Sequence, residues 1–428
     1  MKVTIAYGND GIGLTLPAEA EVEILRPKEA DGLEDEQGAI LAAIRNPIGS
    51  KPLADLAKAG LSAAIVHSDI TRATPNERLL PPTIAELEAA GIAAEDITLI
   101  NGLGTHRRQT EAETRTLLGA GIADRYRTIQ HNCADEENLA EVGRLSTGNR
   151  FRVNRTYLEA DMKILTGFIE PHFFAGFSGG PKAVLPALAG EESVFSNHNY
   201  ARIAHPQASW GITKGNPIWE EMREAALLTK PDFLVNLALN NKKEITAVFA
   251  GEMLAAHEEG CAYVKGNSMA GVEREFDIVI TSNSGYPLDQ NLYQAVKGMD
   301  AAARIVRQDG AILLFAECRD GLPDHGEYAR LLKEGGSPEG VLAMISADGF
   351  LAQDQWQVQI QAQAQKKADV YVYAGGLTDA QIRGALLNPC RNPEELLTRL
   401  VEEKGQRVCV LPEGPQVIPY IKEMAGER

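Results

Sequence analysis

A lysine and two histidines accompany a glycine-rich segment in a pattern that favours a held cofactor. Residues 169–186 contain His172, three glycines and Lys182, and a second histidine, His198, follows sixteen residues after the lysine. Glycines at that density let the backbone approach a bulky or phosphorylated group closely. The set favours an anchored cofactor over a packed core, although a Gly-Gly-Pro turn before a buried strand and a surface lysine would explain the segment taken alone.

Two further polar loops offer groups that suit an anionic ligand. Residues 68–72, Ser-Asp-Ile-Thr-Arg, combine a carboxylate, a hydroxyl and a guanidinium, which suits a phosphate or carboxylate but also an ordinary helix cap beside a solvent-facing arginine. Residues 102–106, Gly-Leu-Gly-Thr-His, place His106 on a loop, where a histidine is more often plain surface. His172 is the stronger candidate, because proline restricts its approach and glycines follow.

Gln294 and Lys297 are three residues apart in a segment, 286–298, that we expect to enter a helix, so both side chains lie on one helical face. A neutral donor and a cation near a helix start suit a small carboxylate. A solvated helix face explains the pair equally well. The glutamine-rich run 353–365 is compatible with a helix whose polar face meets solvent.

Short apolar strands alternate with helical segments and end in these polar loops. The expected strands are residues 63–67, 97–101, 163–169 and 277–281, and a hairpin is expected within residues 2–25 around an Asp-Gly pair. The alternation predicts an α/β fold with mainly parallel sheets. In such sheets, functional residues collect on loops beyond the carboxyl ends of strands.

The chain of 428 residues is long for a single core, so we expect two α/β domains with the active site in the cleft between them. The expected ranges are 1–265 for an N-terminal cofactor-binding domain and 272–412 for a C-terminal substrate or closure domain. Residues 413–428 are expected to form a tail that packs back.

Composition excludes several classes of protein. A formal net charge of −17 argues against a general binder of nucleic acid or anionic membrane, since either needs a basic face. The five cysteines are scattered without a C-x-x-C pair, which fits a reducing cytoplasm. We find no signal peptide, no membrane span and no nucleophile elbow, zinc-protease or phosphate-loop motif. A cytoplasmic protein is expected.

Five sequence blocks, in order over most of the chain, resemble the nickel-dependent lactate racemase family. The blocks are Ser-Asp-Ile-Thr-Arg (68–72), Gly-Leu-Gly-Thr-His (102–106), Pro-His-Phe-Phe-Ala-Gly-Phe-Ser-Gly-Gly-Pro-Lys (171–182), Asn-His-Asn-Tyr-Ala-Arg (197–202) and Tyr-Gln-Ala-Val-Lys (293–297). The third block is the most specific. Two departures are small and lie beside functional positions: Ala73 where proline is expected and Pro181 where alanine is usual.

The resemblance implies a nickel-pincer nucleotide, nickel(II) pyridinium-3,5-bisthiocarboxylic acid mononucleotide, attached covalently through Lys182, with His198 as the protein ligand to nickel. It implies His106 and His172 as the two catalytic bases. Cofactor contacts are implied at Asp69, Ile70, Thr71 and Arg72, and substrate contacts at Arg72, Tyr293, Gln294, Lys297 and Trp356.

The implied activity is an isomerase reaction, the racemisation or epimerisation of lactate or a larger 2-hydroxy acid by hydride transfer through a 2-oxo acid. Histidine has a suitable pKa for moving the hydroxyl proton at neutral pH, and one base per enantiomer requires two. Partners implied are enzymes that build the cofactor and insert nickel. Two alternatives remain open: a cofactor-free protein that binds hydroxy acids, and an enzyme with a Schiff-base cofactor on Lys182.

Overall fold

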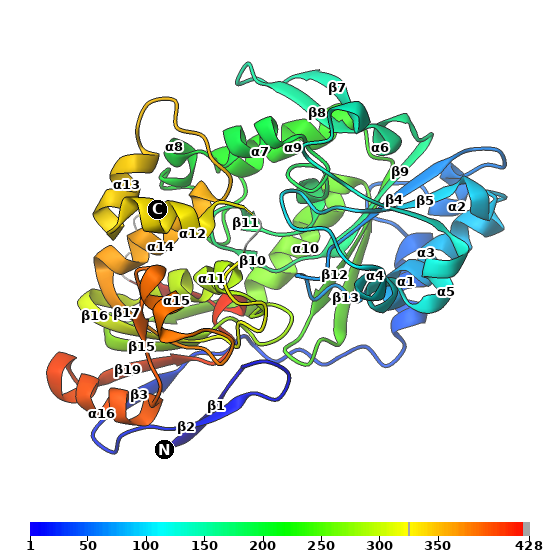
Figure 1. The fold of residues 1–428 in the computed structure, drawn as a ribbon. Helices are drawn as coiled ribbons and strands as arrows, with labels where there is room; N and C mark the ends of the chain where they lie inside the picture. Colours follow the sequence, from blue (N-terminus) through cyan, green and yellow to red (C-terminus); the bar gives the residue numbers. More distant parts are fainter. Residues whose placement is uncertain (324–325, 423–428) are drawn as a thin grey trace. The chain divides into compact units, whose positions relative to one another are not determined.

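The computed structural model describes residues 1–323 and 326–422, which form two compact units, each built around a six-stranded sheet (Figure 1). Unit A consists of Glu29–His198 and His205–Gly266. Unit B consists of Met1–Lys28, Asn199–Ala204 and the described part of Asn267–Arg428. The predicted α/β architecture with mainly parallel sheets is confirmed.

The sheet of unit A has the strand order β13-β12-β9-β4-β5-β6, and neighbouring strands are parallel except β12 and β13. The strands are β4 (Ala63–His67), β5 (Ile97–Asn101), β6 (Arg127–Gln130), β9 (Met162–Phe168), β12 (Phe233–Leu239) and β13 (Ile245–Gly251). Every residue of β4 and β5 is buried. Continuous apolar runs of this kind are typical of parallel strands covered on both faces.

Helices of unit A pack on this sheet and complete its core. They are α1 (Glu36–Arg45), α2 (Leu53–Leu56), α3 (Asn76–Ala89), α4 (Glu111–Leu118), α5 (Ala120–Arg125), α6 (Arg155–Glu159), α7 (Glu191–Asn197), α9 (Pro217–Thr229) and α10 (Met253–Ser268), all but the last two residues of which belong to unit A. Ile40 and Ile44 of α1 and Leu80 of α3 share one cluster with Ile65 and Leu99 of the strands. A two-stranded hairpin, β7 (Leu139–Arg144) and β8 (Arg150–Asn154), also belongs to unit A.

The sheet of unit B has the order β18-β17-β16-β15-β19-β3, and all its neighbouring strands are parallel. The strands are β3 (Glu21–Ile24), β15 (Phe276–Ser282), β16 (Val306–Phe315), β17 (Ala368–Tyr373), β18 (Asn388–Pro389) and β19 (Arg407–Leu411). Its helices are α8 (Tyr200–Ile203), α11 (Leu292–Ala303), α12 (Tyr328–Gly335), α13 (Pro338–Ile345), α14 (Gln355–Lys367), α15 (Asp379–Gly384) and α16 (Pro393–Lys404).

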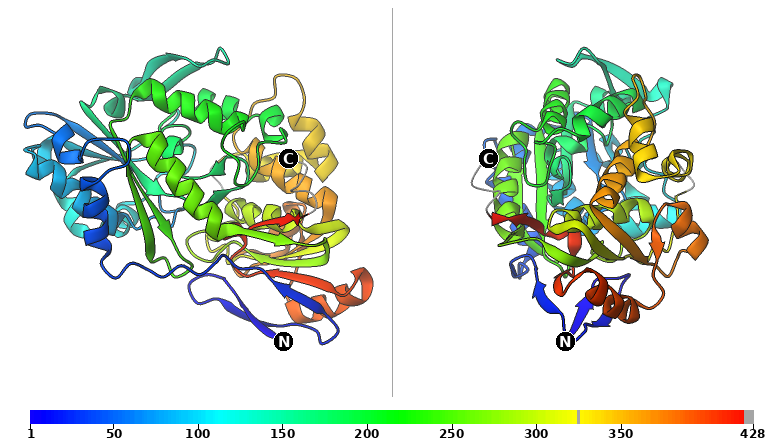
Figure 2. Two further views of the ribbon diagram at one scale, coloured as in Figure 1. Left: turned by 180° about the vertical axis from the view of Figure 1, so that it is seen from behind. Right: turned by 90° about the vertical axis from the view of Figure 1, so that its left-hand side faces the viewer.

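The first residues of the chain belong to unit B. The predicted hairpin is confirmed as β1 (Lys2–Ile5) and β2 (Ile12–Thr15), and both strands contribute to the core cluster of the unit B sheet. β3 then pairs with β19, so the blue N-terminal strands lie beside the red α16 and β19 in Figure 2. The predicted domains, 1–265 and 272–412, are each continuous in sequence. The compact units are not, because residues 1–28 and 199–204 belong to the same unit as the C-terminal segment.

The predicted tail 413–428 is described only in part. Its residues Ile418–Ile421 form β20, which pairs in parallel with β14 (Met269–Val272). Residues 423–428 lie outside the described residues. Among the helices that the structure describes, none combines the length and apolar character that a membrane span requires.

The interpretation of the glutamine-rich run as a solvated helix face is wrong. The run does form a helix, α14, but Gln357, Gln359 and Gln361 are buried. Each of the three donates its side-chain amide to a backbone carbonyl of a neighbouring segment of unit B. Glutamine can both donate and accept, so buried glutamines tie irregular segments to a helix where apolar side chains would leave carbonyls unsatisfied.

Candidate active site

The predicted residues of unit A follow the strands at which the order of its sheet reverses. Along the chain, β4, β5 and β6 extend the sheet in one direction, and β9, β12 and β13 extend it in the other. Open α/β sheets bind ligands beyond the carboxyl ends of the strands at such a reversal. Residues 69–72 follow β4, and His172 follows β9.

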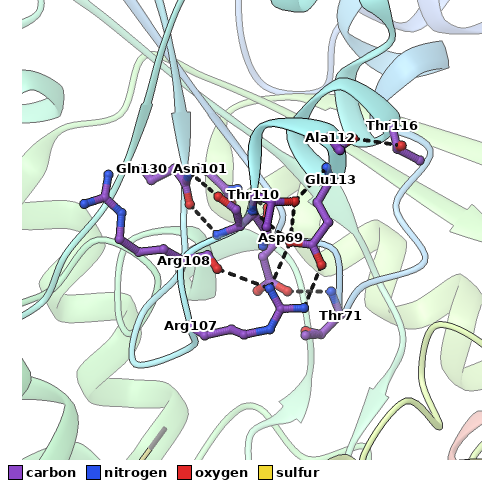
Figure 3. Close-up of polar contacts among 11 residues, drawn as sticks. Asp69, Thr71, Asn101, Arg107, Arg108, Thr110, Ala112, Glu113, Thr116 and Gln130 are labelled. Carbon is purple, nitrogen blue, oxygen red and sulfur yellow. Dashed lines mark hydrogen bonds and ion pairs between the residues drawn. The ribbon is translucent and has the colours of Figure 1, made fainter. Parts of the chain in front are cut away.

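Asp69 organises the loop after β4. Its Oδ1 accepts a hydrogen bond from the Thr71 backbone N–H at 2.6 Å (Figure 3). Its Oδ2 lies 2.9 Å from Nδ1 of His106. Burial alone would raise the pKa of this carboxyl, but His106, Arg72 and Thr71 together hold it well below its usual range. Asp69 is therefore an ionised acceptor at neutral pH.

The loop that carries His106 follows β5, and the residues just after His106 are held by hydrogen bonds. The backbone N–H and carbonyl of Gln109 form two hydrogen bonds with the side chain of Gln130 in β6, at 2.7 and 2.8 Å. The two terminal nitrogens of the Arg107 guanidinium donate to the two carboxylate oxygens of Glu113 in α4, at 2.7 and 2.9 Å. These bonds lower the pKa of the Glu113 carboxyl to about 2. Glu113 also closes a capping box with Thr110 at the start of α4. The loop is thus tied to two secondary structure elements, which restricts where His106 lies.

His172 lies in a short antiparallel pair that follows β9. Strand β10 (Pro171–His172) pairs with β11 (Gly176–Phe177), opposite Gly176, whose φ is +81°. The ring is buried, and its Nδ1 accepts the Ala175 backbone N–H at 3.2 Å. A ring nitrogen that accepts a hydrogen bond carries no proton, so the proton of neutral His172 is on Nε2.

Lys182 lies in a single 3₁₀ turn, Gly180–Ala183, after two glycines with positive φ. The Gly180 N–H donates to Oδ1 of Asn236 in β12 at 2.9 Å, and the Lys182 N–H donates to the Gly179 carbonyl at 3.1 Å. Gly179 has no room for a side chain, because a Cβ there would lie 2.5 Å from the same Asn236 oxygen. The lysine side chain is half-buried.

Phe174 brings three of the predicted residues together. Its ring centroid lies 4.5 Å from the ring of His172, 4.9 Å from the ring of His198 and 5.7 Å from Nζ of Lys182. His198 is buried at the C-terminal end of α7. No local sequence signal separates this role of Phe174 from ordinary core packing.

The remaining predicted residues lie in unit B, where β15 and β19 flank the reversal of its strand order. α11 follows β15, begins after the N-cap Asn291 and carries Tyr293, Gln294 and Lys297. Gln294 and Lys297 are buried, so they do not form a solvated helix face. The indole N–H of Trp356 donates to the Tyr293 hydroxyl at 2.8 Å, which joins two predicted substrate contacts.

The residues of unit A fit an anionic nucleotide. Thr71 Oγ1 and Arg72 Nη1 are buried and have no hydrogen-bond partner among the residues that the structure describes, and buried polar atoms of this kind call for a ligand or water. Glycines 179 and 180 keep the backbone before Lys182 free of side chains. Among the described residues, no group of three or more His, Cys, Asp or Glu side chains lies close enough together to hold a metal ion.

Two family models match this chain, one in its N-terminal part and one in its C-terminal part. Residues 7–211 match the lactate racemase N-terminal domain, and residues 272–419 match the lactate racemase C-terminal domain. The lactate racemase of Thermoanaerobacterium thermosaccharolyticum is 33% identical over 97% of this chain and 99% of its own length. The lactate racemase of Lactiplantibacillus plantarum is 34% identical over 90% of this chain and 91% of its own length.

Solved structures agree with this assignment. The lactate racemase apoprotein from T. thermosaccharolyticum superposes with a TM-score of 0.89 at 32% identity, covering 98% of this chain and 100% of that one. A protein from Thermotoga maritima superposes with a TM-score of 0.68 at 18% identity, covering 93% and 100%, and shares the fold. The chain belongs to the lactate racemase family and is an isomerase of the racemase class.

Proposed function

We propose that this enzyme interconverts the enantiomers of a 2-hydroxy acid by using a nickel-pincer nucleotide attached to Lys182. Lactate is the first candidate substrate, because the relatives that match over nearly their whole length are lactate racemases. The observation that carries the proposal is the grouping of His172, Lys182 and His198 around Phe174. A base, a tether and a metal ligand are thereby held on one aromatic ring.

The residues of unit A would hold the cofactor. Lys182 provides the covalent link, and the imidazole of His198 is a suitable ligand for nickel. Thr71 and Arg72 offer a hydroxyl and a guanidinium to the nucleotide, beside Asp69 and Ile70 on the same loop. When bound, the cofactor would supply a pyridinium ring as the hydride acceptor and donor for C2 of the substrate.

The two proposed bases hold their protons on different ring nitrogens. The Asp69 carboxylate accepts the proton on Nδ1 of His106, so Nε2 is the nitrogen that takes the hydroxyl proton. His172 accepts the Ala175 N–H at Nδ1 and therefore offers a proton from Nε2. Neutral His106 can therefore accept a proton at Nε2. For the opposite enantiomer, His106 would donate as the imidazolium, and His172 would first shift its proton to Nδ1, which ends the bond from Ala175 and frees Nε2.

Unit B would supply the contacts to the substrate carboxylate. Lys297 is a buried cation and Gln294 a buried amide on one face of α11. The hydrogen bond between Trp356 and Tyr293 gives these two aromatic residues a fixed mutual orientation. Charge-assisted contacts from a buried lysine to a carboxylate are strong because water does not screen them.

The proposed cellular setting follows from the cofactor and from the cysteines. Enzymes that synthesise the nucleotide and insert nickel are its expected partners, because such a cofactor does not assemble from free metal. All five cysteines are unpaired thiols, as expected in a reducing compartment, and we propose a cytoplasmic location.

The test is a chiral assay over a panel of 2-hydroxy acids with protein co-expressed with the cofactor pathway. We expect racemisation of at least one acid, and a fall in rate of about 10²-fold or more in His106→Gln and in His172→Gln. His205→Gln alters an exposed histidine of unit A and serves as the matched control with unchanged rate. Wild-type rates in both catalytic variants would contradict the proposal, as would acids that bind to cofactor-loaded protein without racemisation.

A further inference from the structure

A buried histidine outside the predicted site contacts the loop that carries Lys182. Nε2 of His257, in α10, lies 2.9 Å from the backbone carbonyl oxygen of Ser178. A carbonyl only accepts hydrogen bonds, so His257 must carry its proton on Nε2 and donate it. Ser178 precedes Lys182 by four residues.

His257 is a neutral donor in the folded protein. Burial lowers its pKa from 6.5 to about 4, so the ring is neutral at physiological pH. The thiol sulfur of Cys261, one helical turn later, lies 3.4 Å from Nε2 and 3.7 Å from Nδ1, so it packs against the ring without selecting one nitrogen.

The imidazole ring also occupies the space beside Gly180. A Cβ at Gly180 would lie 2.5 Å from Cγ and Cδ2 of His257, and Gly180 has a φ of +51°. Asn236 binds the N–H of the same glycine at 2.9 Å. The rings of Trp219 and His257 are nearly parallel, with 6.5 Å between their centroids. The peptide two residues before Lys182 is therefore fixed by a ring and an amide.

We propose that His257 is a positioning residue for Lys182: by donating to Ser178 and packing on Gly180, it sets where the lysine presents Nζ for cofactor attachment. This inference rests on the proposed attachment of the cofactor to Lys182. Neither His257 nor its bond takes part in the reaction itself.

His131 provides a matched control. It is also fully buried, its pKa is also lowered to about 4 by burial, and its Nε2 also donates to a backbone carbonyl, that of Ala189, at 3.0 Å. Ala189 lies seven residues after Lys182, beyond the 3₁₀ turn. Loss of either histidine should lower stability in a similar way, because each leaves a buried carbonyl unsatisfied.

The test compares His257→Leu, His257→Gln and His131→Leu in two measurements. The first is the rate at which acetic anhydride labels Lys182 in protein made without the cofactor pathway, read by peptide mass spectrometry and normalised to an exposed lysine, Lys214. The second is the fraction of chains that carry the cofactor adduct after co-expression, normalised to the folded fraction. His257→Gln retains an N–H donor, whereas His257→Leu does not.

We expect His257→Leu to change the labelling rate of Lys182 and to lower the adduct fraction, each by about fivefold or more, as loss of a buried hydrogen bond allows. His257→Gln should recover most of both values, and His131→Leu should match wild type. Equal effects of His257→Leu and His131→Leu, or no effect of His257→Leu, would overturn the inference. A wild-type protein without any adduct would instead contradict the proposed function, while the labelling result would still report on His257.

Discussion

Asp69 Oδ2 and His106 Nδ1 lie 2.9 Å apart and join the loops that follow two neighbouring parallel strands, β4 and β5. The carboxylate is buried and ionised, and it fixes the tautomer and orientation of the imidazole. His172 has a backbone N–H at the corresponding nitrogen. The two proposed bases are therefore chemically unlike, even though they perform the same task on opposite enantiomers.

Asp69→Asn tests the role of this carboxylate. The amide keeps the size of the side chain and an oxygen for the Thr71 N–H, but it cannot stabilise a positive charge on His106. We expect kcat to fall by about 10²-fold with little change in stability. The measurement is steady-state kinetics in both directions. Asp161→Asn, which changes an exposed carboxylate of unit A, should retain wild-type kcat; an equal loss in both variants would contradict this role.

Three buried histidines predict how stability depends on pH. Burial lowers the pKa of His67, His131 and His257 from 6.5 to about 4. Each is neutral in the folded protein and takes up a proton when the chain unfolds below pH 6.5. Their stabilising effect is thus complete above pH 6.5 and is lost as pH falls toward 4.

The measurement is the free energy of unfolding in urea at several pH values between 7 and 4. We expect stability to fall with decreasing pH, and His131→Gln to reduce the slope by the equivalent of about one proton. Parallel slopes for wild type and variant would show that His131 titrates alike in both states, contrary to the prediction.

Gly176→Ala tests whether the backbone opposite His172 tolerates a side chain. A Cβ there would lie 2.2 Å from the Ile212 carbonyl oxygen, in addition to the strain of a φ of +81°. Gly148 has a φ of +85°, and a Cβ at that position would have no atom within 4 Å, so Gly148→Ala carries the strain without the clash. We expect Gly176→Ala to lose about 1–3 kcal/mol more than Gly148→Ala in urea unfolding. Equal losses would show that the loop adapts.

The strands of the site could be predicted from the sequence because their signal is local. The apolar runs at 63–67 and 97–101 coincide with β4 and β5. Residues that lie within one sequence block, such as His172 and Lys182, could be singled out for the same reason, and their roles stay predictions.

The contacts between blocks could not be predicted in this way. The Asp69–His106 bond depends on the conformations of two loops on adjacent strands, which no local pattern encodes. His257 lies far along the chain from Lys182, and its spacing from Cys261 is equally typical of a core-facing helix. The buried glutamines of α14 misled the prediction, because their partners are backbone carbonyls distant in sequence.

The attachment of a cofactor to Lys182 is the central claim, and intact mass with nickel content tests it most directly. Wild type, Lys182→Ala and the exposed-lysine control Lys214→Ala are co-expressed with a cofactor-building pathway that loads a known racemase in the same cells. The account predicts a mass adduct and stoichiometric nickel in wild type and in Lys214→Ala, and neither in Lys182→Ala. A wild-type protein without adduct or nickel, or an adduct that persists in Lys182→Ala, would contradict it.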